Sequence, residues 1–160
     1  MGKDVELFIV LPCYNEEEIL PASAEKMMRL LQKLVEDGTV SAESRLLFVD
    51  DGSKDRTWEL IEGLHEKHPV CSGIRLSRNR GHQIAIYSGM VYAVEQGADC
   101  VITIDADLQQ DIRAIPDFLK QHAEGCDIVY GVRKSRDTDR FLKRQQQQCT
   151  IRSCICSAAA

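Results

Sequence analysis

Residues 45–57, RLLFVDDGSKDRT, contain an apolar run, an acidic turn and the start of a helix in direct succession. The apolar run predicts a buried β-strand, because its aliphatic and aromatic residues are bounded by turn-forming residues. Asp51 and Gly52 are typical of a tight turn. Asp55 and Thr57 are typical of a helix start, and the helix is expected to continue to about residue 68.

The same alternation of short apolar runs and longer amphipathic stretches extends in both directions from this segment. Strands are expected at 5–11, 45–50, 72–77, 100–104 and 127–131. Helices are expected over about 17–36, 55–68, 81–96 and 111–123, and Pro116 indicates that the last one starts late or is broken. This order predicts an α/β three-layer sandwich with right-handed crossovers and a mostly parallel sheet of about five strands. Ligands of such sheets bind beyond the carboxyl ends of the strands.

Composition favours one soluble globular domain in the cytoplasm. The chain has 160 residues, of which 44% are hydrophobic and 28% charged. Its longest apolar run, 7–11, is far shorter than the roughly 20 residues that span a bilayer, and it is too short for the core of a signal peptide. Seven scattered cysteines without a CxxC pair are expected to be reduced thiols.

The charge is divided unevenly along the chain. Residues 1–132 hold 13 Lys and Arg against 23 Asp and Glu, whereas residues 133–160 hold 7 against 2. The acidic body argues against a nucleic-acid partner, because it would repel a phosphate backbone. Two interpretations of Arg140, Lys143 and Arg144 remain open, namely contact with an anionic membrane surface and a plain solvated face. Residues 1–144 are expected to form the domain, and 145–160 a low-complexity, disordered tail.

Polar residues follow the first two expected strands. The loop Pro12-Cys13-Tyr14-Asn15-Glu16 offers a fixed turn, an aromatic face and hydrogen-bonding side chains that could grip a planar base; alternatively, Asn15 caps the following helix. Adjacent carboxylates at the end of a buried strand, Asp50 and Asp51, are costly unless they bind something. They either accept hydrogen bonds from a ribose or a base, or fix their own turn with Gly52 at positive φ.

The loop after the third strand combines cations with a helix start. Arg78 and Arg80 lie beside Gly81, where the unpaired N–H groups of the first helical turn favour anionic oxygen. A solvated loop is an equal alternative for Arg80. His82 is expected to be a helix-start residue rather than a catalytic base.

The strongest local signal follows the fourth strand. Asp105 and Asp107 are separated by one residue and can converge on one hard divalent cation, with Gln109 offering another oxygen. Mg²⁺ or Mn²⁺ held in this way would bridge the oxygens of a diphosphate and offset the charge as it departs. The alternative, capping of the next helix, explains Asp111 well and Asp105 poorly. After the fifth strand, Arg133 is best placed to meet phosphate.

Taken together, these motifs resemble the family 2 glycosyltransferases of the GT-A fold. The matching stretches are Pro12-x-Tyr14-Asn15-Glu16, Asp50-Asp51-Gly52-Ser53-x-Asp55-x-Thr57, Ser77-Arg78-Asn79-x-Gly81 and Asp105-x-Asp107-x-Gln109. The polyprenyl-phosphate sugar transferases, such as dolichol-phosphate mannose synthase and the bactoprenol glucosyltransferases, are the most similar branch, and Tyr130-Gly131-x-Arg133 matches it too. The likeness extends from about residue 5 to residue 144.

The resemblance implies inverting transfer of a hexose from UDP-glucose or GDP-mannose to a polyprenyl phosphate or a saccharide, with Mg²⁺ or Mn²⁺ as cofactor. A polyprenyl phosphate would explain the lack of a catalytic base, because a phosphate monoester has a second pKa of about 6 and is already anionic. The resemblance assigns substrate binding to Pro12, Tyr14, Asn15, Glu16, Asp51, Ser53, Asn79 and Gly81, catalysis to Asp105, Asp107 and Arg133, and the metal to Asp105, Asp107 and Gln109.

Family members continue past this point into an acceptor-contacting segment, usually followed by transmembrane helices. The chain is therefore expected to be the front part of an enzyme that acts at the cytoplasmic face of a membrane. One alternative is a non-catalytic remnant that binds nucleotide. Another is a phosphohydrolase of the haloacid dehalogenase type, in which the DxD motif lies on the first strand, whereas Asp105 follows the fourth expected strand.

Overall fold

The structure, a computed structural model, describes residues 5–133 and 149–155. The chain forms two units, residues 1–107 and 108–160. Arg140, Lys143 and Arg144, for which contact with a membrane surface was one interpretation, lie outside the described residues.

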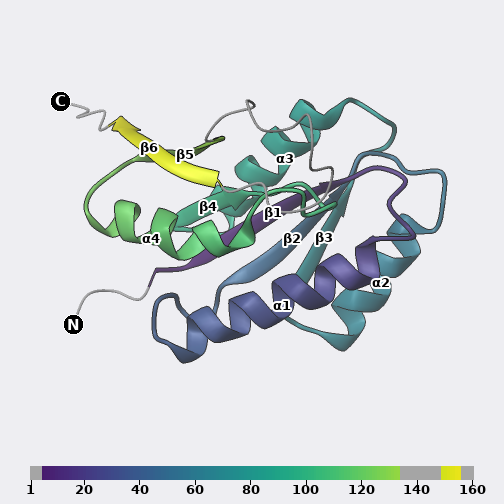
Figure 1. The fold of residues 1–160 in the computed structure, drawn as a ribbon. Coiled ribbons are helices and arrows are strands. Elements are labelled where there is room, and N and C mark those ends of the chain that lie inside the picture. Colours follow the sequence, from purple (N-terminus) through teal and green to yellow (C-terminus); the bar gives the residue numbers. More distant parts are fainter. Residues whose placement is uncertain (1–4, 134–148, 156–160) are drawn as a thin grey trace, which may run out of the picture. The chain divides into compact units, whose positions relative to one another are not determined.

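The first unit is a parallel sheet with helices on both faces. Its strands are β1 (Leu7–Cys13), β2 (Arg45–Asp50), β3 (Cys71–Arg75) and β4 (Cys100–Thr103), in the order β3-β2-β1-β4. Helices α1 (Leu20–Glu36) and α2 (Thr57–Lys67) cover one face, and α3 (His82–Glu95) covers the other (Figure 1). The predicted α/β three-layer class is confirmed.

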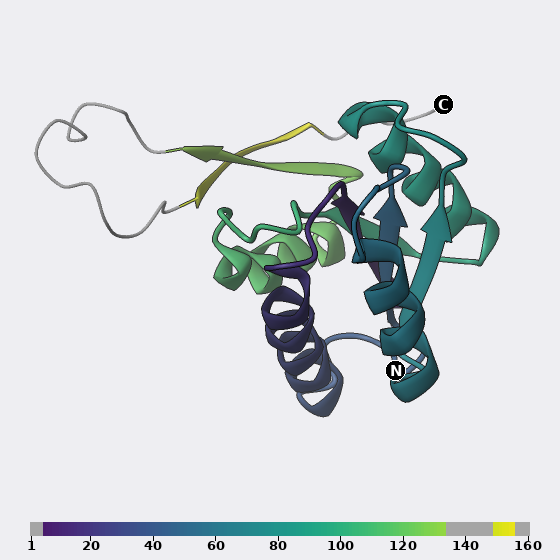
Figure 2. The same ribbon diagram turned by 90° about the vertical axis from the view of Figure 1, so that its right-hand side faces the viewer.

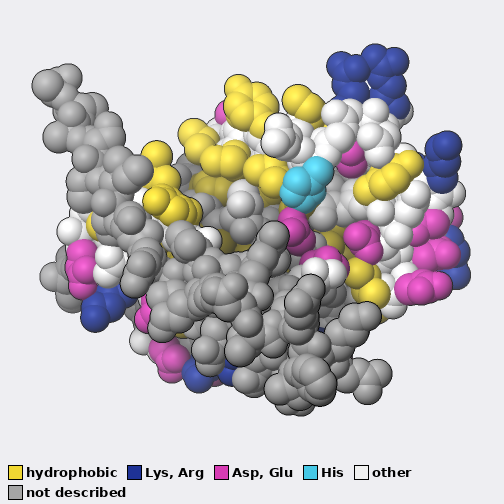
Figure 3. All heavy atoms as spheres, turned by 45° about the horizontal axis from the view of Figure 1, so that its top comes forward, with side chains coloured by type: hydrophobic (Ala, Val, Ile, Leu, Met, Phe, Trp, Pro, Cys, Tyr) yellow, Lys and Arg dark blue, Asp and Glu magenta, His cyan; other side chains and the backbone are white. Residues whose placement is uncertain are grey.

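Strands β1 and β2 form the centre of the core. Every residue of β1 is buried, because helices cover both faces of the strand. On the α3 face, Phe8 and Val10 pack with Leu47 and Val49 against the small residues of the helix. The outer surface of α3 carries a group of hydrophobic side chains (Figure 3).

The second unit differs from the sequence-based expectation in two respects. It contains a short 3₁₀ turn (Ile112–Ala114), α4 (Ile115–Ala123), β5 (Ile128–Arg133) and β6 (Cys149–Ile155). Strand β5 pairs antiparallel with β6 (Figure 2), so the parallel sheet has four strands instead of about five. Residues 149–155 were expected to be part of a disordered tail and instead form this strand. An apolar run indicates that a strand exists, but not which neighbour satisfies its backbone hydrogen bonds.

Two further expectations concern Pro116 and the cysteines. Helix α4 begins late, with Pro116 in its first turn, where the missing N–H costs nothing. Cys13, Cys71 and Cys100 are free thiols, but Cys126 takes part in a disulfide bond, so the expectation of reduced thiols is wrong for that residue.

Within the described part of the chain, no helix combines the length and the apolar character needed to cross a membrane.

Candidate active site

One cavity of about 330 Å³ lies at the carboxyl edge of the parallel sheet, within the first unit. The parallel register brings the strand ends together there, since Cys13 of β1 lies opposite Asp50 of β2, and Asp50 lies opposite Arg75 of β3. The cavity is lined by Pro12, Cys13, Tyr14, Glu16, Asp51, Asn79, Gly81, His82, Ala85, Asp105, Ala106 and Asp107. Residues predicted separately after β1, β2, β3 and β4 therefore meet in one place.

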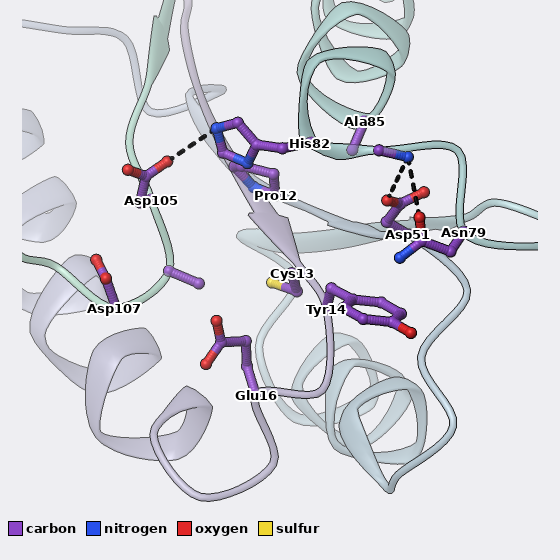
Figure 4. A pocket seen from close by; sticks show the side chains of 12 residues that line it. Pro12, Cys13, Tyr14, Glu16, Asp51, Asn79, His82, Ala85, Asp105 and Asp107 are labelled. Atoms are coloured by element: carbon purple, nitrogen blue, oxygen red, sulfur yellow. Dashed lines mark hydrogen bonds and ion pairs between the residues drawn. The ribbon is translucent and has the colours of Figure 1, made fainter.

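The cavity has two chemically different sides (Figure 4). Tyr14, Asp51 and Asn79 lie on one side and offer an aromatic ring and hydrogen-bonding groups. Asp105 and Asp107 lie on the other, and the Glu16 side chain extends between the two groups. The Tyr14 side chain is 40% exposed, so its ring is accessible for stacking.

Asn15 and Ser53 fix the loops behind the cavity and are not among its lining residues. The Asn15 backbone N–H donates to Ser53 Oγ at 2.9 Å, and Asn15 Oδ1 accepts from the Lys54 N–H at 2.9 Å. Asn15 adopts a φ of 54°, a left-handed conformation that Asn tolerates better than most residues. The Glu16 N–H donates to the buried Thr57 Oγ1 at 2.8 Å, which joins the β1–α1 loop to the start of α2.

The two adjacent carboxylates after β2 have different surroundings. Asp50 is fully buried; its Oδ1 accepts from the Ser53 N–H at 3.0 Å, and its Oδ2 lies 3.1 Å from Arg75 Nε. The Arg75 contact has ion-pair distance but not the alignment of a hydrogen bond, since Asp50 Oδ2 has no hydrogen-bond partner among the residues that the structure describes. Asp50 therefore fixes its own turn, as one of the two interpretations predicted.

Asp51 holds the β3–α3 loop against the cavity. Its Oδ1 accepts from the Arg80 N–H at 2.7 Å and its Oδ2 from the Gly81 N–H at 2.8 Å. Asn79 Oδ1 also accepts from the Gly81 N–H, at 3.1 Å. Gly52 permits this close approach: its φ is +70°, and a Cβ placed there would lie 2.5 Å from the Arg78 carbonyl carbon.

The acidic side of the cavity concentrates negative charge. Burial raises the pKa of Glu16 above its usual value, and the neighbouring carboxylates of Asp107 and Asp55 raise it further. His82 Nε2 lies 3.3 Å from Asp105 Oδ1, so the first residue of α3 contacts the first aspartate of the DxD sequence. The negative charges that help to raise the pKa of Glu16 provide an environment that attracts a cation.

The carboxylates of the cavity suit a divalent cation whose other ligands come from a bound phosphate group and water. Among the described residues, no group of three or more His, Cys, Asp and Glu side chains is arranged to hold a metal ion. Mg²⁺, however, is commonly bound through one or two carboxylates, with phosphate and water oxygens as the other ligands. Asp105 and Asp107 supply such a pair, and the cavity beside them has room for a diphosphate.

Two predicted residues belong to the second unit, and their roles stay predictions. Gln109 follows the cavity residues in sequence, and Arg133 is the last residue of β5, with its side chain outside the described part. Asp111 accepts from the Arg113 N–H at 3.1 Å and caps the 3₁₀ turn, as the helix-cap alternative predicted.

Sequence reasoning did not assign His82, Cys13, Ala85 and Ala106 to the cavity. Each is adjacent in sequence to a predicted residue, or one helical turn after it in the case of Ala85. This proximity was the only indication in the sequence that they belong to the cavity. The Cys13 thiol is 2% exposed, and burial raises its pKa, with Glu16 and Asp50 adding to the effect. It is therefore a poor nucleophile at neutral pH.

Comparison with known proteins identifies the family. Residues 8–157 match the sequence pattern described as glycosyl transferase family 2. The chain belongs to this family. It is 47% identical over 138 residues to an uncharacterized glycosyltransferase, YkoT, of Bacillus subtilis, and 35% identical over 141 residues to the bactoprenol glucosyl transferase of Shigella phage SfV.

A solved mannosyltransferase structure shares the GT-A fold. The mannosyltransferase PcManGT from Pyrobaculum calidifontis, in complex with GDP-Man and Mn²⁺, superimposes with a TM-score of 0.55 at 18% identity, covering 74% of this chain and 32% of that one. The matched regions cover 86% of this chain and 41% of YkoT, and 88% of this chain and 43% of the phage protein. The chain thus spans about two fifths of the length of these relatives.

Proposed function

We propose that this chain is the nucleotide-sugar-binding part of a metal-dependent, inverting glycosyltransferase. The donor would be UDP-glucose or GDP-mannose, and the acceptor a polyprenyl phosphate or a saccharide. The observation that carries the proposal is the single cavity in which Tyr14 and Asn79 lie on one side and the Asp105–Asp107 pair on the other. Its two sides suit the two ends of a nucleotide-diphosphate sugar, a planar base and a charged diphosphate.

The base and ribose would occupy the side that contains Tyr14. An exposed aromatic ring can stack on any base, and Pro12 fixes the backbone that positions it. Asp51 contributes by holding Asn79 and Gly81 at the cavity, because both of its carboxylate oxygens already accept backbone hydrogen bonds. Glu16 lies between the two sides and is available to the ribose or to the cation.

Asp105 and Asp107 would hold Mg²⁺ or Mn²⁺, which when bound would offset the charge on the departing diphosphate. The relative solved with GDP-Man and Mn²⁺ supports this choice of cofactor. His82, by its contact with Asp105, would keep the carboxylate oriented. Arg133 would meet phosphate of the donor or the acceptor.

The acceptor phosphate would be its own nucleophile. One of its oxygens would form a bond to the anomeric carbon as the bond from that carbon to the diphosphate breaks, which inverts the configuration. Such an anion needs no protein base at neutral pH, so the protein's contribution would be alignment and charge stabilisation. The bactoprenol glucosyl transferase relatives support a polyprenyl phosphate acceptor and, with it, action at the cytoplasmic face of a membrane.

Isothermal titration calorimetry of UDP and GDP, with and without Mn²⁺, tests the donor site. We expect one nucleotide to bind more tightly with Mn²⁺, and Asp107→Asn to lower this metal-dependent affinity at least about 100-fold. Asp37→Asn, the same change at the exposed end of α1, is the matched control and is expected to bind like wild type. Nucleotide binding that needs no metal and is unchanged in Asp107→Asn would contradict the metal site.

Transfer is tested separately with a sugar-labelled donor. We expect label in the organic phase when a short polyprenyl phosphate is added, and label in the aqueous phase when a saccharide is the acceptor. Metal-dependent nucleotide binding without any transfer would support the non-catalytic alternative for this chain and would leave the donor site intact.

A further inference from the structure

Helix α3 is apolar on both of its faces. Its inner face packs on the sheet through Ala85, Gly89 and Ala93, all of which are buried. Every exposed residue between Ile84 and Val94 is also apolar. These residues, called the outer stripe below, are Ile84 (47% exposed), Tyr87 (66%), Met90 (42%), Val91 (38%) and Val94 (65%) (Figure 3).

The helix on the opposite face of the same sheet shows that this is not a general property of the protein. Between Glu25 and Glu36, the exposed positions of α1 are Glu25, Lys26, Arg29, Gln32, Lys33 and Glu36, all charged or amide residues. A helix that is apolar all round is normally covered on both sides, and a continuous apolar surface of this kind marks an interaction site.

The spacing of the outer stripe suits a second helix. Ile84, Tyr87, Val91 and Val94 follow the i, i+3, i+7, i+10 pattern of a seam between two helices. Residues 83–94 contain no charged side chain that would have to be desolvated on contact. A lengthwise helix contact is therefore the geometry that the stripe favours.

The two ends of α3 carry opposite charges. Exposed Arg78 and Arg80 precede the helix, and exposed Glu95 is its last residue. Two copies of α3 packed antiparallel would bring Arg80 of each copy toward Glu95 of the other, at both ends of the seam. In this orientation, the positive end of each helix dipole would also lie beside the negative end of the other. The chain is thus complementary to itself in one orientation, as a two-fold symmetric contact requires.

We propose that the outer stripe of α3 is a self-association surface, on which a second copy of this chain docks with its α3 antiparallel. An anionic lipid surface fits less well, because it would meet the exposed Glu95 at one end of the stripe. The proposal is independent of the donor and acceptor chemistry. It does concern the same helix, since Gly81 and His82 at the start of α3 line the cavity.

Sedimentation equilibrium of the 160-residue chain over roughly 1 to 100 μM tests the proposal. Wild type is expected to show a reversible monomer–dimer equilibrium. Tyr87→Glu is expected to weaken association at least about 30-fold, because exposed aromatic anchors dominate such contacts and each dimer contains the change twice. Gln32→Glu adds the same charge to the exposed face of α1 and is expected to dimerise like wild type. Far-UV circular dichroism verifies that both variants are folded.

Charge reversal tests the orientation. Arg80→Glu and Glu95→Arg are each expected to weaken the dimer about threefold to tenfold at low salt, and the double variant to restore it. A wild-type monomer throughout the range, or a dimer that Tyr87→Glu does not weaken, would overturn the proposal. Failure of the double variant to recover would overturn the antiparallel arrangement. Co-sedimentation of a monomeric wild type with vesicles containing anionic lipid would assign the stripe to a membrane instead.

Discussion

Replacement of Gly52 by alanine tests how the β2 turn supports the cavity. Gly52 has a φ of +70°, and an added Cβ would lie 2.5 Å from the carbonyl carbon of Arg78, 2.7 Å from its Cα and 2.7 Å from the backbone nitrogen of Asn79. All three are backbone atoms, which cannot rotate away as a flexible side chain can. The β3–α3 loop would therefore have to shift.

The expected cost has two parts. Left-handed φ costs an alanine about 1 kcal/mol relative to glycine. The shift of the loop would also stretch the hydrogen bonds of 2.7 and 2.8 Å that Asp51 accepts from Arg80 and Gly81. A hydrogen bond to a charged group contributes about 1.5–3 kcal/mol, so weakening this pair adds about 2 kcal/mol. We expect Gly52→Ala to lower the free energy of unfolding by about 3 kcal/mol.

Gly38→Ala separates the two parts. Gly38 has a φ of +69°, nearly the same as Gly52, but a Cβ there would meet no atom within 4 Å. Urea unfolding followed by circular dichroism is expected to show a loss of about 1 kcal/mol for Gly38→Ala. Metal-dependent nucleotide affinity is expected to fall only in Gly52→Ala, because the displaced loop carries Asn79 and Gly81. Equal stability losses within about 0.5 kcal/mol would refute the close approach of the two loops.

Three further predictions concern Glu16, Gly89 and Thr57. Burial, Asp107 and Asp55 raise the pKa of Glu16 above its usual 4.5, so the protonated side chain favours the folded state at low pH and this contribution is lost as the pH rises through the raised pKa. Glu16→Gln should therefore raise the melting temperature more at pH 7 than at pH 4. Equal shifts at the two pH values would contradict this. A Cβ on Gly89 would overlap the Val10 side chain and lie 2.9 Å from Val49 Cγ2, whereas one on Gly63 meets nothing within 4 Å. Urea unfolding should show a loss of about 1–3 kcal/mol for Gly89→Ala and a gain of about 0.5–1 kcal/mol for Gly63→Ala; similar values would argue against tight packing of α3. Thr57→Val removes the hydroxyl that accepts from the Glu16 N–H at 2.8 Å, and urea unfolding should show a loss of about 1–2 kcal/mol, which Thr57→Ser should largely restore.

Much of the fold could be predicted because its signals are local. The observed α1, α2 and α3 lie within two or three residues of the expected helices, and the four parallel strands appear where apolar runs were found. The pairing of β5 was not accessible in this way, since hydrogen-bond partners depend on residues distant in sequence. The disulfide bond of Cys126 could not be predicted either, because it depends on which other thiol the folded chain brings close to Cys126.

The same division applies to the site. The sequence by itself determined that Tyr14, Asp51, Asn79 and the Asp105–Asp107 pair follow strands of a parallel sheet, and motif order indicated the family. Only the tertiary structure decided that Asp51 accepts hydrogen bonds from the backbone of Arg80 and Gly81. It also decided that the Asn15 N–H donates to Ser53 behind the cavity and that His82 contacts Asp105. Motifs specify which groups are present, whereas a hydrogen bond depends on distance and direction between atoms that only the folded chain brings together.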